Sequence, residues 1–145
     1  MSMGDSGTYA LVITLPTELS LQIGKLGVYN LQPGYYVYAG SALNGLSNRL
    51  KRHSRSDKKL HWHIDYLLQK ANLTQIWYAM GPDRLECRWN MIIQNLPGAT
   101  TSIPGFGSSD CHCSSHLTHF RTIPPPQSFQ RRLGARQMTT SALDN

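Results

Sequence analysis

The sequence is poor in cysteine and lacks any long apolar run. It has three cysteines among 145 residues, Cys87, Cys111 and Cys113. An odd number of cysteines without a secretion signal argues against a disulfide framework. No apolar run approaches the roughly 20 residues that span a bilayer, and residues 1–6 lack the basic and apolar pattern of a signal peptide. We therefore expect a cytoplasmic protein with no membrane segment.

Acidic residues are also scarce. The chain has 8 Asp+Glu against 14 Lys+Arg, a formal net charge of +6, and its only two glutamates are Glu18 and Glu86. This balance favours a polyanionic partner, because each phosphate contact releases counterions. The alternative is a basic surface that does no more than keep the protein in solution. The candidate partner is therefore a nucleic acid, DNA or RNA; the oligomeric state stays open.

The length and an apolar content of 40% fit one domain with a core. Apolar periodicity predicts strands at 8–15, 19–23, 28–31, 35–39, 74–80 and 114–120, and helices at 43–55, 59–71 and 83–94. Asp83 is the expected N-cap of the third helix. After residue 121 the chain has three consecutive prolines and no apolar periodicity. We predict a folded domain at 1–120 and a disordered, basic and Pro-rich tail at 121–145.

Two tyrosines are candidate catalytic residues. Tyr9 lies on the first predicted strand and Tyr38 on a later one, so both hydroxyls reach one site if these strands are neighbours. A phenol titrates near ~10 and is a poor base at neutral pH, but nearby cations and a metal-bound water lower its pKa. The alternative is that both side chains simply pack in the core.

The helix after Gly40 is rich in cationic side chains. A guanidinium forks onto phosphate oxygens and can stabilise a pentacovalent phosphorane, and Arg49 shares a helix face with His53, a candidate catalytic residue. The other basic residues here are candidates for holding flanking phosphates: Lys51, Arg52, Arg55, Lys58 and Lys59. A solvated helix face is the alternative.

Three further groups are candidate ligands. Glu86, on the third predicted helix, offers the carboxylate oxygen that Mg²⁺ or Mn²⁺ prefers, and one such ligand plus substrate phosphates is enough for a site. His61, His63 and Asp65 are candidates for substrate binding, or else parts of a packed helix. The last group is a candidate zinc site, although its spacing matches no common finger: Cys87, Cys111, Cys113 and His116.

Taken together, these motifs resemble the GIY-YIG nuclease family, in particular its compact Uri-type endonucleases, first catalogued as domain of unknown function 123. The resemblance covers about residues 6–120 and lies in an ordered set of segments. These are Gly7-Thr8-Tyr9, Tyr35-Tyr36-Val37-Tyr38-Ala39-Gly40-Ser41-Ala42, Arg49-Leu50-Lys51-Arg52-His53, residues 60–67, Leu85-Glu86-Cys87 and residues 104–111.

The resemblance implies a small α/β (α+β) fold, with a central antiparallel three-stranded sheet flanked by helices. It implies a hydrolase that cleaves phosphodiester bonds in DNA with one divalent ion. In that family pattern Glu86 matches the metal ligand and Arg49 the arginine that stabilises the transition state. Tyr9 and Tyr38 match the motif tyrosines, one of which acts as a base or orients water, and His53 matches a polar position near the site. Ser41, within the second motif, is a candidate substrate-binding residue.

The chain departs from the family pattern in three respects. Thr8 and Ala39 each replace an isoleucine, both at expected packing positions. The motif tyrosines stand 29 residues apart (38 − 9), and a hairpin inserted between the two motif strands accounts for that spacing. Two alternatives to a nuclease remain open: a nucleic-acid-binding module that has lost catalysis, and a zinc-stabilised interaction protein.

Overall fold

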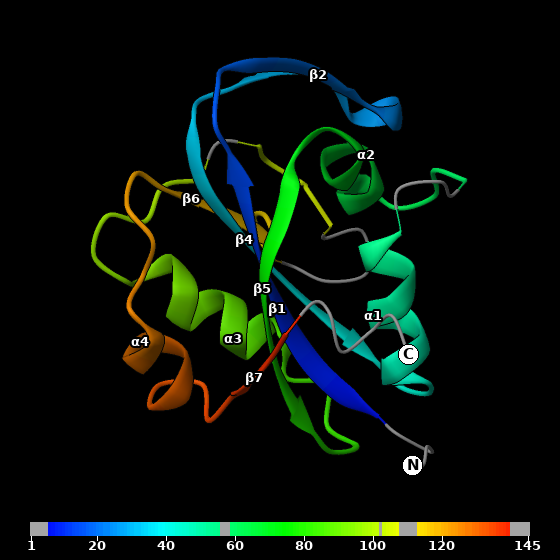
Figure 1. Ribbon diagram of the computed structural model, residues 1–145, viewed down its shortest axis with the longest axis vertical. Coiled ribbons are helices and arrows are strands. Elements are labelled where there is room, and N and C mark those ends of the chain that lie inside the picture. Colours follow the sequence, from blue (N-terminus) through cyan, green and yellow to red (C-terminus); the bar gives the residue numbers. More distant parts are fainter. Residues whose placement is uncertain (1–5, 56–58, 102, 108–112, 140–145) are drawn as a thin grey trace.

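The computed structural model describes residues 6–55, 59–101, 103–107 and 113–139, and it mixes antiparallel strands with short helices (Figure 1). The strands are β1 (Gly7–Leu15), β2 (Leu19–Ile23), β3 (Gly27–Leu31), β4 (Gly34–Ala42), β5 (Asn72–Met80), β6 (Leu117–Phe120) and β7 (Arg136–Met138). The helices are η1 (Gly24–Leu26, a 3₁₀ turn), α1 (Leu46–Ser54), α2 (His63–Lys70), α3 (Glu86–Gln94) and α4 (Pro126–Gln130).

The first three predicted helices are present but begin later than expected. Gly45 precedes α1 with φ +75°, a left-handed conformation that the helix cannot include. Asp83 is not the N-cap of α3, because the residue before that helix is Leu85. The predicted α3 therefore loses its first turn, and Glu86 becomes its first residue.

The main sheet has five strands in the order β6-β4-β1-β5-β7, so the expectation of three strands is wrong. The predicted three are its centre, where β4, β1 and β5 pair antiparallel. β1 is buried along nearly its whole length, as a central strand covered on both faces must be. Both edge strands are short. β6 has four residues and falls within the strand predicted at 114–120, whereas β7 has three residues, too few to show a period-2 pattern.

The hairpin inserted between the two motif strands is confirmed. β2 and β3 pair with each other in a separate two-stranded sheet. The hairpin lies beside α2 (Figure 1), and Leu21, Ile23 and Leu31 bury their side chains in the same core as the first motif strand.

The prediction of a disordered tail from residue 121 is wrong for residues 121–139. Phe129 of α4 is fully buried and stacks on Trp77 of β5, with ring centroids 4.9 Å apart and an interplanar angle of 6°. β7 then pairs with β5 through Ile76, Trp77 and Tyr78. One aromatic and one short strand attach this segment, and neither produces a local apolar period.

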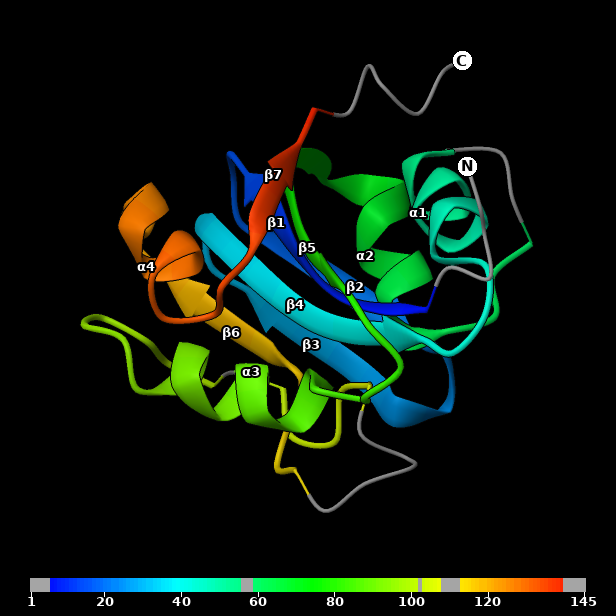
Figure 2. The ribbon, with the colours of Figure 1, turned by 90° about the horizontal axis from the view of Figure 1, so that it is seen from below.

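The helices cover both faces of the sheet, as Figure 2 shows. On one face α1 and α2 pack through Leu46, Leu50, Ile64 and Leu67. On the other, α3 and α4 pack through Trp89, Ile93 and Phe129. Because side chains alternate across a strand, β1 contributes side chains to the hydrophobic core on each face of the sheet. None of the described helices is long and apolar enough to cross a membrane.

Candidate active site

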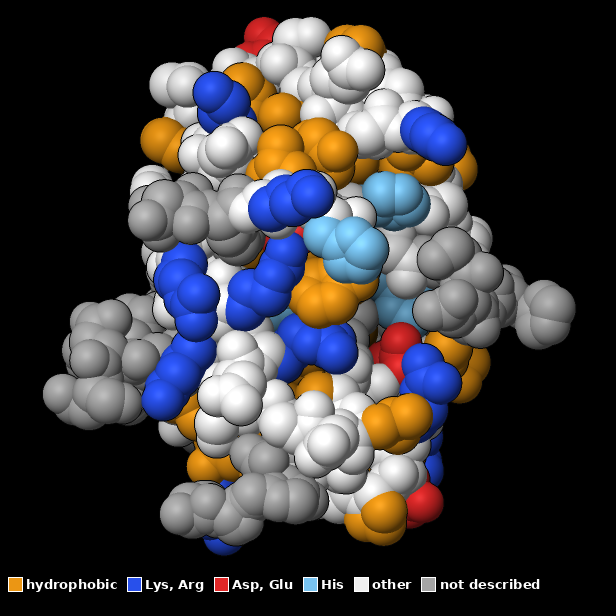
Figure 3. Space-filling model, turned by 90° about the vertical axis from the view of Figure 1, so that its right-hand side faces the viewer, with side chains coloured by type: hydrophobic (Ala, Val, Ile, Leu, Met, Phe, Trp, Pro, Cys, Tyr) orange, Lys and Arg blue, Asp and Glu red, His pale blue; other side chains and the backbone are white. Residues whose placement is uncertain are grey.

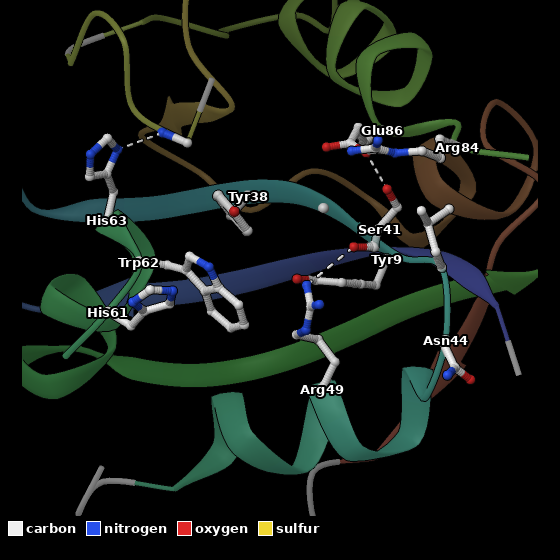
Figure 4. Close-up of a pocket in the computed structure, with 13 residues that line it drawn as sticks. Tyr9, Tyr38, Ser41, Asn44, Arg49, His61, Trp62, His63, Arg84 and Glu86 are labelled. Atoms are coloured by element: carbon white, nitrogen blue, oxygen red, sulfur yellow. Dashed lines mark hydrogen bonds and ion pairs between the residues drawn. The ribbon is translucent and has the colours of Figure 1, made fainter. Parts of the chain in front are cut away.

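A pocket of about 510 Å³ lies where the C-terminal half of β4 meets α1, the start of α2 and the start of α3 (Figure 4). β6 pairs only with Tyr35–Tyr38 of β4, which leaves the rest of β4 at the sheet edge, where the pocket forms. The pocket is lined by Tyr9, Tyr38, Gly40, Ser41, Leu43, Asn44, Arg49, His61, Trp62, His63, Arg84, Glu86 and Gly107.

The two motif tyrosines meet in this pocket. β1 and β4 are neighbours, with Leu11 opposite Tyr38 and Tyr9 opposite Gly40, so both tyrosines lie on one face, with ring centroids 6.4 Å apart. A Cβ on Gly40 would lie 2.6 Å from the Tyr9 hydroxyl oxygen. Glycine is therefore needed at position 40 to let the Tyr9 ring lie across the neighbouring strand.

Burial keeps both hydroxyls protonated. It raises the pKa of Tyr9 to about 12, although the charge of Arg49 and a hydrogen bond with it act in the opposite direction. The pKa of Tyr38 is raised well above 10, again mainly by burial. Neither side chain is a phenolate at neutral pH, so neither is a base by itself.

The Tyr9 hydroxyl lies 2.8 Å from Nε2 of His53. His53 is buried on the inner face of α1, behind Tyr9 rather than in the pocket lining. When this nitrogen is unprotonated, it accepts the phenol proton, and the phenol oxygen can then take a proton from a group in the pocket. Arg49 lines the pocket, and His53, one helical turn further along α1, lies behind Tyr9.

Arg49 is held by the face of Trp62 and by the backbone of β4. Its Cζ atom lies 4.4 Å from the centroid of the Trp62 ring, and Nη1 donates to the Ser41 carbonyl oxygen at 3.3 Å. A cation over an indole face is attracted by the ring quadrupole, so the guanidinium is oriented before any substrate enters.

Arg52, a candidate for holding flanking phosphates, makes an ion pair between the two helices α1 and α2. It lies over the same Trp62 ring at 4.3 Å, but its two terminal nitrogens each donate to the carboxylate of Asp65 at 2.8 Å. Asp65 is fully buried and also accepts the backbone N–H groups of His61 and Trp62. Burial alone would raise the pKa of this carboxyl, but these hydrogen bonds hold it below 3.8. The pair joins α1 to α2, and neither residue lines the pocket.

Glu86 enters the pocket from the first turn of α3. The Ser41 hydroxyl donates to its Oε1 atom, and Arg84 Nε lies 3.3 Å from the same oxygen. The buried Thr8 hydroxyl accepts the backbone N–H of Leu85 at 3.2 Å. Thr8 thus fixes the start of α3, which is more than the packing expected at this departure from the family pattern.

The Glu86 carboxylate fits a hard divalent cation. Its side chain is 18% exposed and the pocket beside it has space for further oxygen ligands. Mg²⁺ is commonly bound through one or two carboxylates plus waters and substrate phosphates. Arg84 is 52% exposed, so its side chain has room to move off the carboxylate.

Two histidines line the opposite wall. His61 is exposed, whereas His63 is half-buried and its pKa is lowered by burial. Nδ1 of His63 accepts the backbone N–H of Gly107 at 2.8 Å, so in the neutral ring the proton is on Nε2. The structure thus brings both histidines, but not Asp65, to the pocket.

The remaining basic candidates lie outside the pocket on and after α1. Lys51 is partly exposed, and Arg55 and Lys59 are exposed, while Lys58 lies outside the described residues. Figure 3 shows Lys and Arg side chains gathered on this side of the molecule, beside histidines. The surface next to the pocket is therefore positively charged.

The Cys/His candidates gather behind Glu86, outside the pocket. Ligand atoms of Cys87, Cys113 and His116 lie within 4.8 Å of one another. Cys111 lies outside the described residues.

Six lining residues of the pocket were not among the predicted site residues: Gly40, Leu43, Asn44, Trp62, Arg84 and Gly107. Trp62 carries the clearest sequence signal, since an aromatic between His61 and His63 is typical of a binding surface. Arg84 and Asn44 are in turns, and only the tertiary structure brings them to the site.

The family model of the domain of unknown function DUF123 matches residues 8–138. The chain belongs to the DUF123 family. The matched span includes every lining residue of the pocket and also α4 and β7, so the DUF123 domain extends well past residue 120. No curated protein and no solved structure matches the chain.

Proposed function

We propose that this DUF123 domain is a divalent-metal-dependent endonuclease of the GIY-YIG type, which hydrolyses phosphodiester bonds in DNA. The observation that carries the proposal is the pocket itself. It gathers Tyr9, Tyr38, Arg49 and Glu86 from four different elements at one sheet edge. The resemblance to GIY-YIG nucleases singles out the same four residues.

Three of these four side chains, together with His53 and His63, are assigned a role in this reaction. Arg49, held by Trp62, is placed to balance charge that develops on the phosphate. Tyr9 takes a proton from the attacking water as it passes its own proton to Nε2 of His53. Tyr9 can therefore act in the reaction although its hydroxyl is not ionised at neutral pH. Nε2–H of His63 is available to a phosphate oxygen. Glu86 would hold Mg²⁺ or Mn²⁺, which when bound supplies Lewis-acid stabilisation of the phosphate oxygens.

The test is a cleavage assay on supercoiled, single-stranded and branched DNA with Mg²⁺ or Mn²⁺. We expect the wild type to cut in the presence of metal and Glu86→Gln to lose at least about 10²-fold in rate, since metal stabilisation of charge contributes several kcal/mol. The matched control is Glu18→Gln, which changes the other glutamate, an exposed residue of the hairpin. Equal rates in the wild type and both variants would contradict the proposal.

One contact favours a second function, a nucleic-acid-binding module without catalysis. Arg84 neutralises the Glu86 carboxylate at 3.3 Å, where a metal ion would compete with it. Tight and salt-sensitive DNA binding with no cleavage under any divalent metal, in the wild type and in Arg84→Ala, would establish this function instead.

A further inference from the structure

We infer that Cys87, Cys113 and His116 form a zinc-binding site that fixes the start of α3, separate from the metal site at Glu86. Cys87 lies in the first turn of α3, while Cys113 and His116 lie on the segment that leads into β6. Their ligand atoms are all within 4.8 Å of one another. Two segments more than twenty residues apart thus converge on one small volume.

The spacing suits tetrahedral zinc. With Zn–S near 2.3 Å and Zn–N near 2.1 Å, two ligand atoms of a tetrahedral site stand about 3.5–3.8 Å apart. The Cys87 sulfur lies 3.8 Å from Nε2 of His116. Thiolate and imidazole together favour zinc over Mg²⁺ or Ca²⁺, which prefer oxygen ligands.

The histidine is oriented as a ligand. His116 is 1% exposed, and its Nδ1 lies 3.0 Å from the Ala39 carbonyl oxygen, which can only accept a hydrogen bond. The ring proton is therefore on Nδ1, and the Nε2 lone pair faces Cys87. A carbonyl that fixes the tautomer in this way is the usual outer partner of a metal-bound histidine.

The site is joined to the pocket through short connections. Cys87 directly follows Glu86, and Ala39 directly follows Tyr38 in β4. The backbone of His116 also donates to the Phe106 carbonyl oxygen at 2.7 Å, beside Gly107, which holds His63. Among the described residues, three protein side chains converge on this site, and tetrahedral zinc takes four ligands. Zinc here would connect α3, β4 and the backbone at Phe106 and Gly107, which borders the pocket.

The experiment uses the whole chain, purified under reducing conditions without chelator or added metal. Elemental analysis should find about one zinc per chain. Replacement with Co²⁺ should give the intense visible absorption of a tetrahedral site with thiolate charge-transfer bands. Bound zinc should also protect Cys87 and Cys113 from alkylation, and a strong chelator should remove that protection. This assay needs only the wild-type protein.

Variants then assign the ligands. We expect Cys87→Ser and His116→Gln each to weaken zinc binding more than about 100-fold, because loss even of an outer partner costs 10–100-fold. The matched control is His119→Gln, a histidine of β6 whose ring lies against Pro33 and Thr100. Zinc content should be unchanged in this control and in Glu86→Gln, which separates the site from the proposed nuclease metal.

Three outcomes would overturn the inference: no zinc and no Co²⁺ binding by the reduced protein, full zinc content in both Cys87→Ser and His116→Gln, or a Cys87–Cys113 disulfide found by mass spectrometry in the freshly isolated protein. None of these measurements depends on DNA cleavage, so the inference stands or fails independently of the proposed function.

Discussion

The protonation state of Tyr9 decides what this residue can do in the proposed reaction. A phenol with a pKa of about 12 stays neutral at physiological pH, so it acts only if another base takes its proton. In the proposed reaction His53 is that base, since its Nε2 atom lies 2.8 Å from the Tyr9 hydroxyl oxygen and accepts the proton when it is unprotonated. The pair thus behaves as one proton acceptor divided between a strand and a helix.

Tyr9→Phe should therefore lower the cleavage rate by about 10²–10⁴-fold, the usual contribution of a positioned proton acceptor. DNA affinity should change little, because phenylalanine lacks the hydroxyl but keeps the same aromatic ring. The measurements are single-turnover cleavage and equilibrium binding. Tyr78→Phe is the matched control, since Tyr78 lies opposite Tyr9 on β5 and does not line the pocket. Equal loss in both variants would contradict a chemical role for Tyr9.

The buried tyrosines also make stability depend on alkaline pH. Tyr9 and Tyr36 have pKa values raised from 10.0 to about 12, mainly by burial. A raised pKa in the folded state contributes stability that is complete below pH 10 and is lost as pH rises toward 12. We expect the free energy of unfolding to fall over this range, and Tyr36→Phe to reduce the fall. Denaturant unfolding at several pH values measures it, and an unchanged fall would count against burial at Tyr36.

Among the elements, α3 carries Glu86 and is held at its start by β1. The Thr8 hydroxyl accepts the N–H of Leu85 at 3.2 Å, a bond that an isoleucine at this position could not make. The motif strand therefore positions the two sides of the pocket at once, through Tyr9 on one face and Thr8 on the other.

Thr8→Val keeps the shape of the side chain but leaves the Leu85 N–H without its acceptor. We expect a loss of about 1 kcal/mol in unfolding free energy and a lower cleavage rate, since Glu86 loses its anchor. The control is Thr118→Val on β6, where the buried hydroxyl has no hydrogen-bond partner in the described part of the chain. Removing that hydroxyl should be neutral or stabilising. Similar destabilisation in both variants would refute the anchoring role.

The segment α4–β7 completes the sheet at the edge opposite β6. Phe129 is 0% exposed and lies flat on Trp77, so Phe129→Ala should cost about 3–5 kcal/mol in unfolding free energy. Ile123→Ala, at a position 37% exposed, should cost less than about 1 kcal/mol. Chemical denaturation compares the two, and a small effect at Phe129 would mean that residues 121–139 are dispensable.

At the scale of the whole molecule, the basic residues behind the net charge of +6 are unevenly distributed around the pocket. The basic residues on and after α1 flank the pocket (Figure 3), whereas Arg131 and Arg132 follow α4, which packs on the other face of the sheet (Figure 2). A long polyanion bound in the pocket would contact only the first set.

The salt dependence of DNA binding tests this asymmetry. Replacing Arg55 and Lys59 with alanine should flatten the slope of log affinity against log salt by about two units, one per lost phosphate contact. The same change of charge at Arg131 and Arg132, both exposed beyond α4, should leave the slope nearly unchanged. Fluorescence anisotropy at several salt concentrations gives both values. Equal slopes for the two double variants would mean that the DNA does not bind preferentially at the surface beside the pocket.

Much of the fold and site was predictable from local pattern. Apolar periodicity located the central strands, the inserted hairpin and the first three helices, because in each of these elements the spacing of the apolar residues indicates which face is buried. The resemblance to GIY-YIG nucleases predicted that Tyr9, Tyr38, Arg49 and Glu86 share a site, and the pocket brings all four together. Residue chemistry alone also identified Cys87 and His116 as candidate ligands.

The tertiary structure decided what depends on pairing between distant segments. β6 begins at Leu117, opposite Tyr38, and so leaves the rest of β4 as an open sheet edge for the pocket. Asp65 is turned inward to Arg52, and α4 and β7 attach through Phe129 and a three-residue ladder. Short or polar segments carry no period, and their positions follow from which partner buries them or satisfies their hydrogen bonds. The sequence by itself thus determined the chemical groups of the site, while packing decided which of them face the pocket and which hold it in place.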